Sequence, residues 1–492
     1  MQLKAREFLS ALCVGAVFVI PAPSALSMLG GSWLLTSGFF CILLWTESKA
    51  SNAARGWLLS ALASTLMAFL QVQDNTAWTL GWVSASPDFQ AYANLRQRNH
   101  LASLLAIGLC AVLYFSMRGS DHPHPKFASQ MLVGLAVSLM TLAQALTASR
   151  TGALQWFAVL GLAAWLMLRS GKKQSLWVIA WAGVGFMVCS AGLAWYADTS
   201  SVTGIVGRFS DDNAMSRLPL WRNVLELIAQ KPLLGWGWRG LAYAHYSTDF
   251  SGNRFMEMLD NAHNLPMHLA VELGLPVALI FCGGVVWLIW KNKPWTETQP
   301  DRQLAWGILM VIGIHSMVEY PLWYGPFFMT ALICVGILCV DLWRNWPLAL
   351  TKSAQNAINL GVKGLGFLVL VCTIFAAFDY HRVSQIYLPP DQRSTWYADD
   401  ALGAAKRSVL FQSHAKFAEL VITPLSRETA PRILALSSEL VVWSPEPRVI
   451  EKLIESAVLM QLDELAAFHL RRYRVAYPSA YKNWAQAQGV SP

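Results

Sequence analysis

Charged side chains are scarce in this sequence. Asp, Glu, Lys and Arg together make up 13% of the 492 residues, about half the share that is usual in soluble domains. Hydrophobic residues make up 55%, and the mean hydropathy is +0.40. This composition excludes a chain built only of soluble domains and indicates a polytopic membrane protein.

Paired cysteines and metal-ligand spacings are also lacking. All eight cysteines fall inside apolar runs, without a CxxC pair and without histidines at ligand spacing, so we expect no disulfide framework, no metal and no cofactor. The net charge of +8 comes largely from Lys and Arg in short loops between apolar runs. There they set membrane orientation, so we expect a lipid bilayer and no nucleic acid as partner.

Long apolar runs are abundant, and eleven of them are long enough to cross about 30 Å of hydrocarbon. The first also resembles a cleavable signal peptide, because basic residues precede it and the small residues PAPSA follow it; we favour a retained span. The runs are Met1–Ala22, Leu26–Trp45, Trp57–Val72, Leu101–Met117, Phe127–Leu146, Gly152–Leu168, Leu176–Tyr196, Leu269–Trp290, Leu304–Val318, Phe327–Trp343 and Gly361–Phe378.

Loop cations predict the orientation. Alternate connections are rich in Lys and Arg and are therefore cytoplasmic. The large polar interruption at 197–263 then faces outward, as does the tail. We expect a transmembrane domain at 1–379 and a soluble domain at 380–492, whose apolar residues recur at helical spacing. Paired helices of this kind form tetratricopeptide-like arrays, although no clean repeat of about 34 residues is present.

The outward side collects cations and other polar side chains at span ends, and arginines are unusual there. Guanidinium groups bind phosphate oxygens through paired hydrogen bonds, so a pyrophosphate would explain the set. The alternative for each is an interfacial side chain that reaches lipid headgroups or pairs with a carboxylate. Arg150 lies in a short turn between two apolar runs, and Arg96 and Arg98 lie just before a span. The other members are Asn94, Asn99, Arg217, Arg222, Arg239, His263 and Glu319.

SRLPLWRNVLELIAQ predicts an amphipathic surface helix, with Arg217, Trp221, Val224, Leu225 and Ile228 at helical spacing. The PLLGWGWRG that follows can turn tightly at its glycines. It lacks the lysine of a nucleotide phosphate loop.

The motif NAHNLPMHLAVELGLP makes the most specific prediction. Asn264 is a good N-cap and Pro266 suits a first turn, so we expect a span to begin here with His263 just outside it. A helix N-terminus attracts phosphate and disfavours imidazolium, which suits His263 as a general base. The alternative is a hydrogen-bonded interfacial histidine. We expect His268 to be structural.

HSMVEYPLWYGP places Glu319, Tyr320 and Tyr324 at another outward turn. Glu319 could orient His263 or pair with an arginine, and Tyr320 could donate a hydrogen bond to phosphate. For Tyr324 we favour the aromatic belt of the membrane interface.

NLRQRNHLASLL, TASRTG, the spaced RLPLWRN and KPLLGWG, and NAHNLPMHLAVELGLP together resemble the bacterial O-linked oligosaccharyltransferases of the O-antigen ligase and polymerase superfamily. The resemblance covers about 91–326. It implies an all-α membrane glycosyltransferase, similar to type C, with about 11–12 spans, a large periplasmic loop and an inner-membrane location. Its donor would be a glycan on undecaprenyl pyrophosphate, without nucleotide sugar or metal. The family's essential histidine matches His263, its pyrophosphate-binding arginines match Arg150 and Arg217, and its late tyrosine matches Tyr320. Residues that match by region only are Arg96, Arg98 and Arg222.

The implied reaction is an inverting displacement at the anomeric carbon, with a Ser or Thr hydroxyl of a periplasmic protein such as a pilin as acceptor. An O-antigen ligase, whose acceptor is lipid A core, and an O-antigen polymerase use the same chemistry and stay open. A polyprenyl-glycan transporter would place charges at the membrane midplane and show internal repeats; the sequence shows neither feature. A membrane scaffold would leave the outward arginines unexplained.

Overall fold

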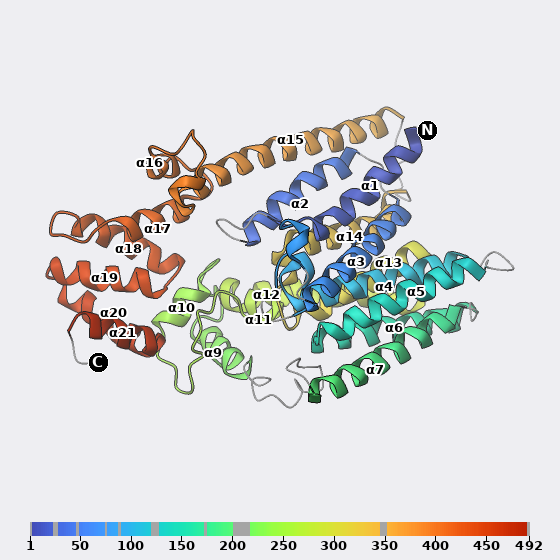
Figure 1. Cartoon of the computed structure of the whole chain (residues 1–492), viewed down its shortest axis with the longest axis horizontal. Coiled ribbons are helices and arrows are strands. Elements are labelled where there is room, and N and C mark those ends of the chain that lie inside the picture. Colours follow the sequence, from blue (N-terminus) through green and yellow to red (C-terminus); the bar gives the residue numbers. More distant parts are fainter. Residues whose placement is uncertain are drawn as a thin grey trace. The chain divides into compact units, whose positions relative to one another are not determined.

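The computed structural model describes residues 2–22, 28–45, 49–73, 76–86, 90–119, 127–171, 175–199, 217–344 and 352–489. Every regular element within these ranges is helical, as expected for an all-α membrane protein (Figure 1). Residues 200–216 of the predicted polar loop lie outside the described part. The chain divides into a first unit, Met1–Ala214 with Ile289–Ile374, and a second unit, Met215–Leu288 with Phe375–Pro492.

The first unit is a bundle organised around α4 (Arg98–Gly119), which packs on α3, α6 and α13. An 18-residue window of α4 is 89% buried, and a helix that is apolar on all sides suits such a central position. The surrounding elements are α1 (Gln2–Val19), α2 (Met28–Trp45), α3 (Ala50–Val72), η1 (Ala77–Thr79), η2 (Ala93–Leu95), α5 (Phe127–Leu146), α6 (Arg150–Ser170), α7 (Leu176–Thr199), η5 (Pro294–Thr296), α13 (Pro300–Ser316), η6 (Pro321–Trp323) and α14 (Gly325–Arg344).

Seven described helices are long and apolar enough to cross a membrane, and two shorter apolar helices lie in α2 and α14. Ten of the eleven predicted spans match single helices of the structure, while the total of about eleven to twelve crossings stays a prediction. The seven are Ala50–Val72, Arg98–Arg118, Ala128–Leu146, Arg150–Ser170, Leu176–Trp195, Leu275–Thr296 and Asn356–Tyr387.

One predicted span is wrong in its extent. The apolar run Leu269–Trp290 is divided at Gly274 into a short helix α11 (Leu265–Leu273) and a long helix α12 (Leu275–Asn292). Gly274 has φ 88° and ψ 161°, a conformation that is almost confined to glycine and cannot continue a helix. The helix that follows His263 is therefore not itself the span.

The first predicted span packs tightly in the bundle. A Cβ at Gly15 of α1 would lie 2.7 Å from the carbonyl oxygen of Gly56 in α3, and one at Gly56 would lie 2.4 Å from that of Ala11. Two backbones approach this closely only where small residues face each other. The packing places α1 directly against α3, while the retained first span stays a prediction.

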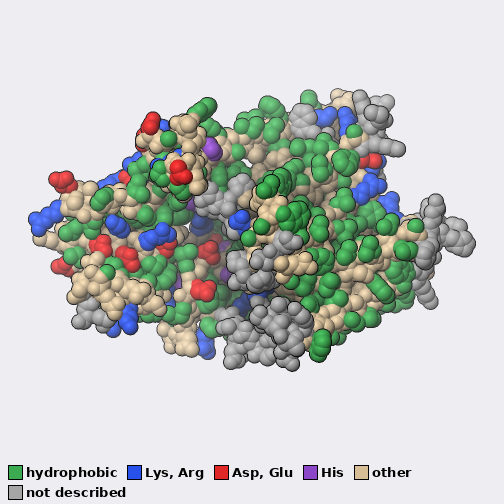
Figure 2. Space-filling model, in the orientation of Figure 1, with side chains coloured by type: hydrophobic (Ala, Val, Ile, Leu, Met, Phe, Trp, Pro, Cys, Tyr) green, Lys and Arg blue, Asp and Glu red, His purple; other side chains and the backbone are tan. Residues whose placement is uncertain are grey.

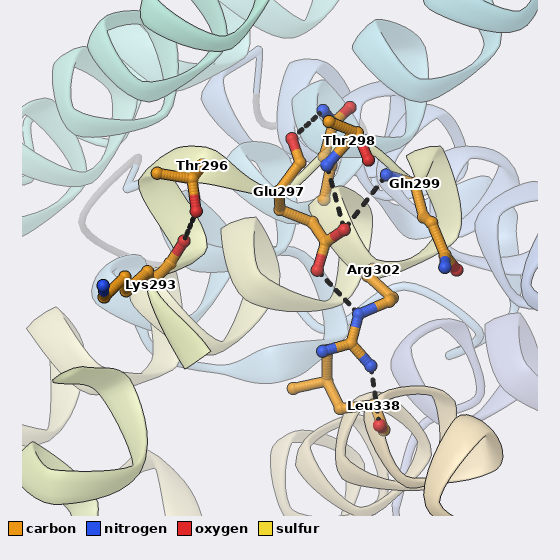
Figure 3. A network of polar contacts seen from close by, with 8 residues as sticks. Lys293, Thr296, Glu297, Thr298, Gln299, Arg302 and Leu338 are labelled. Atoms are coloured by element: carbon orange, nitrogen blue, oxygen red, sulfur yellow. Dashed lines mark hydrogen bonds and ion pairs between the residues drawn. The ribbon is translucent and has the colours of Figure 1, made fainter. Parts of the chain in front are cut away.

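The connection between α12 and α13 is tied by a carboxylate (Figure 3). Glu297 accepts hydrogen bonds from the backbone N–H groups of Thr298 and Gln299 and lies 2.6 Å from Nε of Arg302. Arg302 also donates to the carbonyl of Leu338 in α14, at 2.8 Å. Burial raises the pKa of Glu297, but these hydrogen bonds outweigh it, and the net shift is downward. Arg302 is thus a structural link as well as a loop cation.

The second unit joins the loop helices to the C-terminal tail. Helices α17 to α21 follow one another as an array in which α18 packs on α19 and α19 on α20 (Figure 1). Its elements are α9 (Arg217–Gln230), α10 (Leu241–Ser247), α11, α12 as far as Leu288, α15 (Lys352–Ser384, shared with the first unit), η7 (Gln385–Tyr387), η8 (Pro390–Gln392), α16 (Ala401–Lys406), α17 (Gln412–Ile422), α18 (Ala430–Trp443), α19 (Pro447–Leu459), α20 (Asp463–Ala476) and α21 (Pro478–Ala487). Because α15 passes through residue 379, the predicted domain boundary there stays a prediction.

Loop helix α10 is docked on the tail array. The hydroxyl of buried Tyr246 lies 3.0 Å from Nδ1 of buried His469 in α20, and the two rings are stacked. Arg472 pairs with Asp249, and the guanidinium of Arg239 lies over the ring of Trp443. Charged side chains gather over the tail helices, whereas hydrophobic ones cover much of the bundle face (Figure 2). The tail therefore holds part of the loop as well as forming its own core.

Candidate active site

The turn between α5 and α6 fixes Arg150. Ser149 is the N-cap of α6, and its hydroxyl accepts a hydrogen bond from the N–H of Gly152 at 2.9 Å. Arg150 is the first residue of the helix and is exposed. A Cβ at Gly152 would meet the side chains of Ala102 and Gln144 at 2.4 and 2.6 Å, so the turn is held against α4. Arg150 thus begins a helix whose position is closely defined.

Asn99 of α4 connects this turn to Glu319. Its amide nitrogen donates to Oε1 of Glu319 at 3.3 Å, and its oxygen accepts from the hydroxyl of Ser149 at 2.7 Å. Glu319 follows α13 and is 5% exposed. The structure therefore brings the ends of α4, α6 and α13 together in the first unit, where Asn99 is bonded to Glu319 and to Ser149, the residue before Arg150.

Arg96 lies in a second tightly held turn. Its φ of 53° is left-handed, and its Nε lies 3.2 Å from the hydroxyl of Ser84. Gln71 holds the same segment through hydrogen bonds with backbone groups of Ser84, Tyr92 and Ala93. Arg98 is the first residue of α4. A pocket beside Arg96 is lined by Phe18, Asn94 and Tyr324, among other residues.

Tyr320 and Tyr324 lie on either side of η6. Their rings are stacked with centroids 6.0 Å apart, and the ring of Tyr324 contacts buried His100 at 4.0 Å. His100 in turn lies 5.3 Å from buried His315 of α13. Tyr324 is therefore packed on the bundle, and Tyr320 is packed on Tyr324.

His263, in the second unit, has an unusual and well-held conformation. Its φ is 51°, in the left-handed region that non-glycine residues adopt uncommonly. Its N–H donates to the side-chain oxygen of Asn261 at 2.9 Å, and Nδ1 lies 3.0 Å from the carbonyl oxygen of Asn261. A carbonyl only accepts, so Nδ1 carries the proton. In the neutral tautomer with this proton on Nδ1, the lone pair lies on Nε2, the nitrogen that can accept a proton.

The cap expected after His263 is confirmed. Asn264 is the N-cap of α11, its side chain accepts from the N–H of Met267 at 3.0 Å, and Pro266 lies in the first turn. His268 is buried, with Nδ1 3.4 Å from the N–H of Ala262 and Nε2 3.5 Å from the carboxylate of Glu272. Burial lowers the pKa of His268 to about 4, and the neighbouring His263 adds to this shift. These bonds hold both ends of α11.

Helix α9 is amphipathic, as predicted, but one member of its expected apolar face is wrong. Leu225 is exposed, and the buried positions are Leu220, Asn223, Val224, Leu227 and Ile228. The indole of Trp221 donates to the carbonyl of Ala262 at 3.1 Å, next to His263. Arg217 lies one helical turn before Trp221 and therefore on the same side of α9.

Arg222 has different surroundings. It is exposed, and its guanidinium lies 3.7 Å from where a Cβ on Gly252 would be. It is five positions from Arg217, so the two arginines leave α9 in different directions. Arg217 therefore shares a helix face with Trp221, whose indole is bonded to Ala262, the neighbour of His263. Arg222 does not share that face.

Sequence reasoning missed Ser149 and Asn261, and it placed Asn99 in the outward polar set without predicting its contacts. Asn99 and Ser149 link three helices, and Asn261 orients His263. Ser149 has a recognisable signal, because serine before RTG suits an N-cap. Asn261 has none, since its contact depends on the left-handed turn. Within the described ranges, no three His, Cys, Asp or Glu side chains form a group suited to a metal ion.

Comparison with known proteins agrees with the motifs. A family model described as O-Antigen ligase matches residues 135–282, one described as Protein glycosylation ligase matches 91–115, and one described as Virulence factor membrane-bound polymerase, C-terminal, matches 303–490. The chain is 24% identical over 426 residues to a General O-oligosaccharyltransferase of Acinetobacter baylyi, which covers 83% of this chain and 71% of that protein. It is 23% identical over 349 residues to a ComP-specific O-oligosaccharyltransferase of the same organism, which covers 68% of this chain and 56% of that protein.

Proposed function

Because the chain belongs to the bacterial O-oligosaccharyltransferases of the O-antigen ligase superfamily, and is thus a membrane glycosyltransferase, we propose that it transfers a preassembled glycan from undecaprenyl pyrophosphate to a protein. The acceptor is a Ser or Thr hydroxyl of a periplasmic protein such as a pilin. The site faces the periplasm from the inner membrane, and the reaction uses no metal.

The observation that supports this mechanism best is the geometry of His263. The Nδ1–H group is bonded to the carbonyl of Asn261, which makes Nε2 the ring nitrogen with the lone pair that accepts a proton in the proposed reaction. The acceptor oxygen forms a bond to the anomeric carbon while the bond from that carbon to the pyrophosphate breaks. The hydroxyl proton passes to Nε2, and the electron pair of the broken bond leaves with the pyrophosphate. One displacement of this kind inverts the anomeric carbon.

Arginines are proposed to stabilise the leaving group. Arg150 and Arg217 are the first choices, because Arg150 begins a firmly held helix and Arg217 lies on the face of α9 that reaches Ala262. Arg96 and Arg98 are further candidates at held turns or helix starts. Arg222 is the weakest candidate, since it leaves α9 in another direction.

Glu319 and Tyr320 are proposed to assist. The bond from Asn99 to Glu319 supports a role for Glu319 in holding the start of α6 and, through it, Arg150. The alternative role for Glu319 is to orient His263. The carbonyl of Asn261 already orients that ring through its bond to Nδ1. Tyr320 is proposed to donate its hydroxyl proton in a hydrogen bond to phosphate.

The test is transfer by purified enzyme in detergent or vesicles. Undecaprenyl-pyrophosphate-linked glycan is mixed with a pilin or with lipid A core, and His263→Ala is run beside His381→Ala, an exposed histidine outside the proposed machinery. We expect glycosylated pilin with the unchanged enzyme and with His381→Ala, and none with His263→Ala. Activity retained by His263→Ala would remove the histidine from the mechanism.

The choice of acceptor in this assay distinguishes protein glycosylation from the related functions. Transfer to lipid A core alone would make the protein an O-antigen ligase, which the match over residues 135–282 also allows. Longer lipid-linked glycan without either product would indicate a polymerase. Movement of the donor across vesicles without any transfer would indicate a transporter.

A further inference from the structure

The loop at 231–239, which we call the GWG loop, is fastened to the junction between α11 and α12. The N–H of Trp236 donates to Val271 at 2.8 Å, that of Gly237 to Glu272 at 2.9 Å, and that of Leu275 to Pro232 at 2.8 Å. The buried carboxylate of Glu272 also accepts from backbone N–H groups at the end of the loop. The loop therefore has a defined position relative to the first residue of α12.

Two glycines make this attachment close. A Cβ at Gly235 would lie 2.4 Å from the carbonyl oxygen of Glu272, and one at Gly274 would lie 2.1 Å from that of Leu233. Both glycines have left-handed φ angles, of 66° and 88°. A side chain at either position would force the two backbones apart, so the loop and the junction form one piece.

The same loop exposes large apolar side chains. Leu233 is 71% exposed, Leu234 is 85% exposed and Trp238 is 62% exposed. Burying a side chain of this size is worth about 1.5–3 kcal/mol. Single exposed apolar residues are common, but three on a short and firmly held loop indicate a partner surface.

The position of helix α12 indicates that the partner surface is the lipid bilayer. Leu275–Thr296 is long and apolar enough to span a membrane, and its best window is only 6% buried. Its side chains therefore face lipid, and its first residue marks one edge of the hydrocarbon. Since the loop is bonded to Leu275 itself, Leu233 and Leu234 lie at that edge. Trp238 and the cation Lys231 suit the same level, where aromatic rings and snorkelling lysines are enriched.

We propose that the GWG loop is a membrane anchor, whose Leu233, Leu234 and Trp238 side chains enter the interfacial layer of the leaflet where α12 begins. The occupant is the bilayer, and the proposal does not depend on glycan transfer. Its consequence concerns His263. Helix α11 has nine residues and is about 13 Å long. Two more residue steps, of up to about 3.3 Å each, separate it from His263, so the anchor fixes the height of His263 to within about 20 Å.

A depth measurement tests the anchor directly. An environment-sensitive fluorescent amino acid is placed at Leu234 in the full chain, which is reconstituted in vesicles of phosphatidylethanolamine and phosphatidylglycerol. Quenching is measured with lipids that carry a spin label at the headgroup, near the top of the acyl chain or near its end. The references are exposed Ile280 on α12 and exposed Glu257 in the same unit.

We expect position 234 to be quenched most by labels at the headgroup and upper chain, position 280 by labels deeper in the chain, and position 257 by none. Quenching at 234 no stronger than at 257 would overturn the anchor. Quenching or a blue shift that appears only after undecaprenyl-pyrophosphate-linked glycan is added would also overturn it, and would assign the surface to the donor lipid.

A second labelled position shows whether the label at Leu234 has itself disturbed the loop. The same amino acid at Trp238 must report the same depth, and each labelled protein must unfold at the temperature of the unlabelled chain. Agreement between the two probes supports insertion of the whole loop. If position 238 lies in water while 234 does not, the three-residue anchor is wrong.

Discussion

Replacing Gly274 by alanine is expected to destabilise the second unit by about 3 kcal/mol. The backbone conformation at φ 88° and ψ 161° costs a non-glycine residue about 1–3 kcal/mol. The new Cβ would also lie 2.1 Å from the carbonyl oxygen of Leu233. Relieving that contact separates the backbones and breaks the hydrogen bond from Leu275 to Pro232, which is worth about 1 kcal/mol.

Gly284→Ala is the matched control. Gly284 lies in helix α12, which begins directly after Gly274, and a Cβ there would meet nothing within 4 Å. Both variants and the unchanged chain are heated in detergent, and trypsin cleavage after Arg239 is followed at temperatures below unfolding. Gly274→Ala should unfold earlier and be cleaved faster, whereas Gly284→Ala should be at least as stable as the unchanged chain and be cleaved no faster, because alanine suits a helix interior better than glycine. Equal behaviour of the two variants would refute the argument that the junction cannot separate.

Three further changes test other parts of the structure. Asn99→Leu removes the link between Glu319 and Ser149 and is expected to lower kcat for glycan transfer at least tenfold without loss of folded protein; unchanged kcat would argue against Asn99 as a positioning residue. Tyr246→Phe removes the hydroxyl from buried His469 and should cost about 1 kcal/mol in unfolding measurements; no loss would show that the bond contributes little. Burial lowers the pKa of His469 from 6.5 to about 4, so the unfolded chain gains its proton first as the pH falls. Stability attributable to this group is then full above pH 6.5 and declines by up to about 3 kcal/mol towards pH 4, and His469→Gln should show a correspondingly smaller loss between pH 7 and pH 5.

Most of the helices could be predicted because long apolar runs carry their own signal. The cap at Asn264 could be predicted for a similar reason, since an N-cap and a first-turn proline act over only a few residues. The break at Gly274 could not, because the apolar pattern continues across it. What interrupts the helix is a backbone conformation required by a loop about forty positions earlier in the chain, and no periodicity reports that.

The contacts of the candidate site show the same limit. Asn99 and Glu319 are 220 positions apart and meet only because α4 and α13 pack in one bundle. Asn261 orients His263 across two positions, but only while His263 has a left-handed φ. Residue types and motifs indicated that His263 and Arg150 take part in the chemistry, whereas the contacts that Asn99 and Asn261 make to position them are visible only in the folded chain.

The proposed glycan transfer and the proposed membrane anchor are connected by a geometric requirement of a lipid-linked donor. A pyrophosphate carried by a polyprenyl lipid is presented near the headgroup layer, so a general base has to be held at a fixed height above the same bilayer. In the second unit, α11 begins two residues after His263 and ends at the junction that binds the GWG loop, and that junction is also the start of α12. Backbone hydrogen bonds and two glycine contacts connect these elements without a flexible side chain between them. A base held in this way follows the membrane surface, because backbone contacts connect the anchoring loop to the junction and the chain of α11 connects the junction to His263.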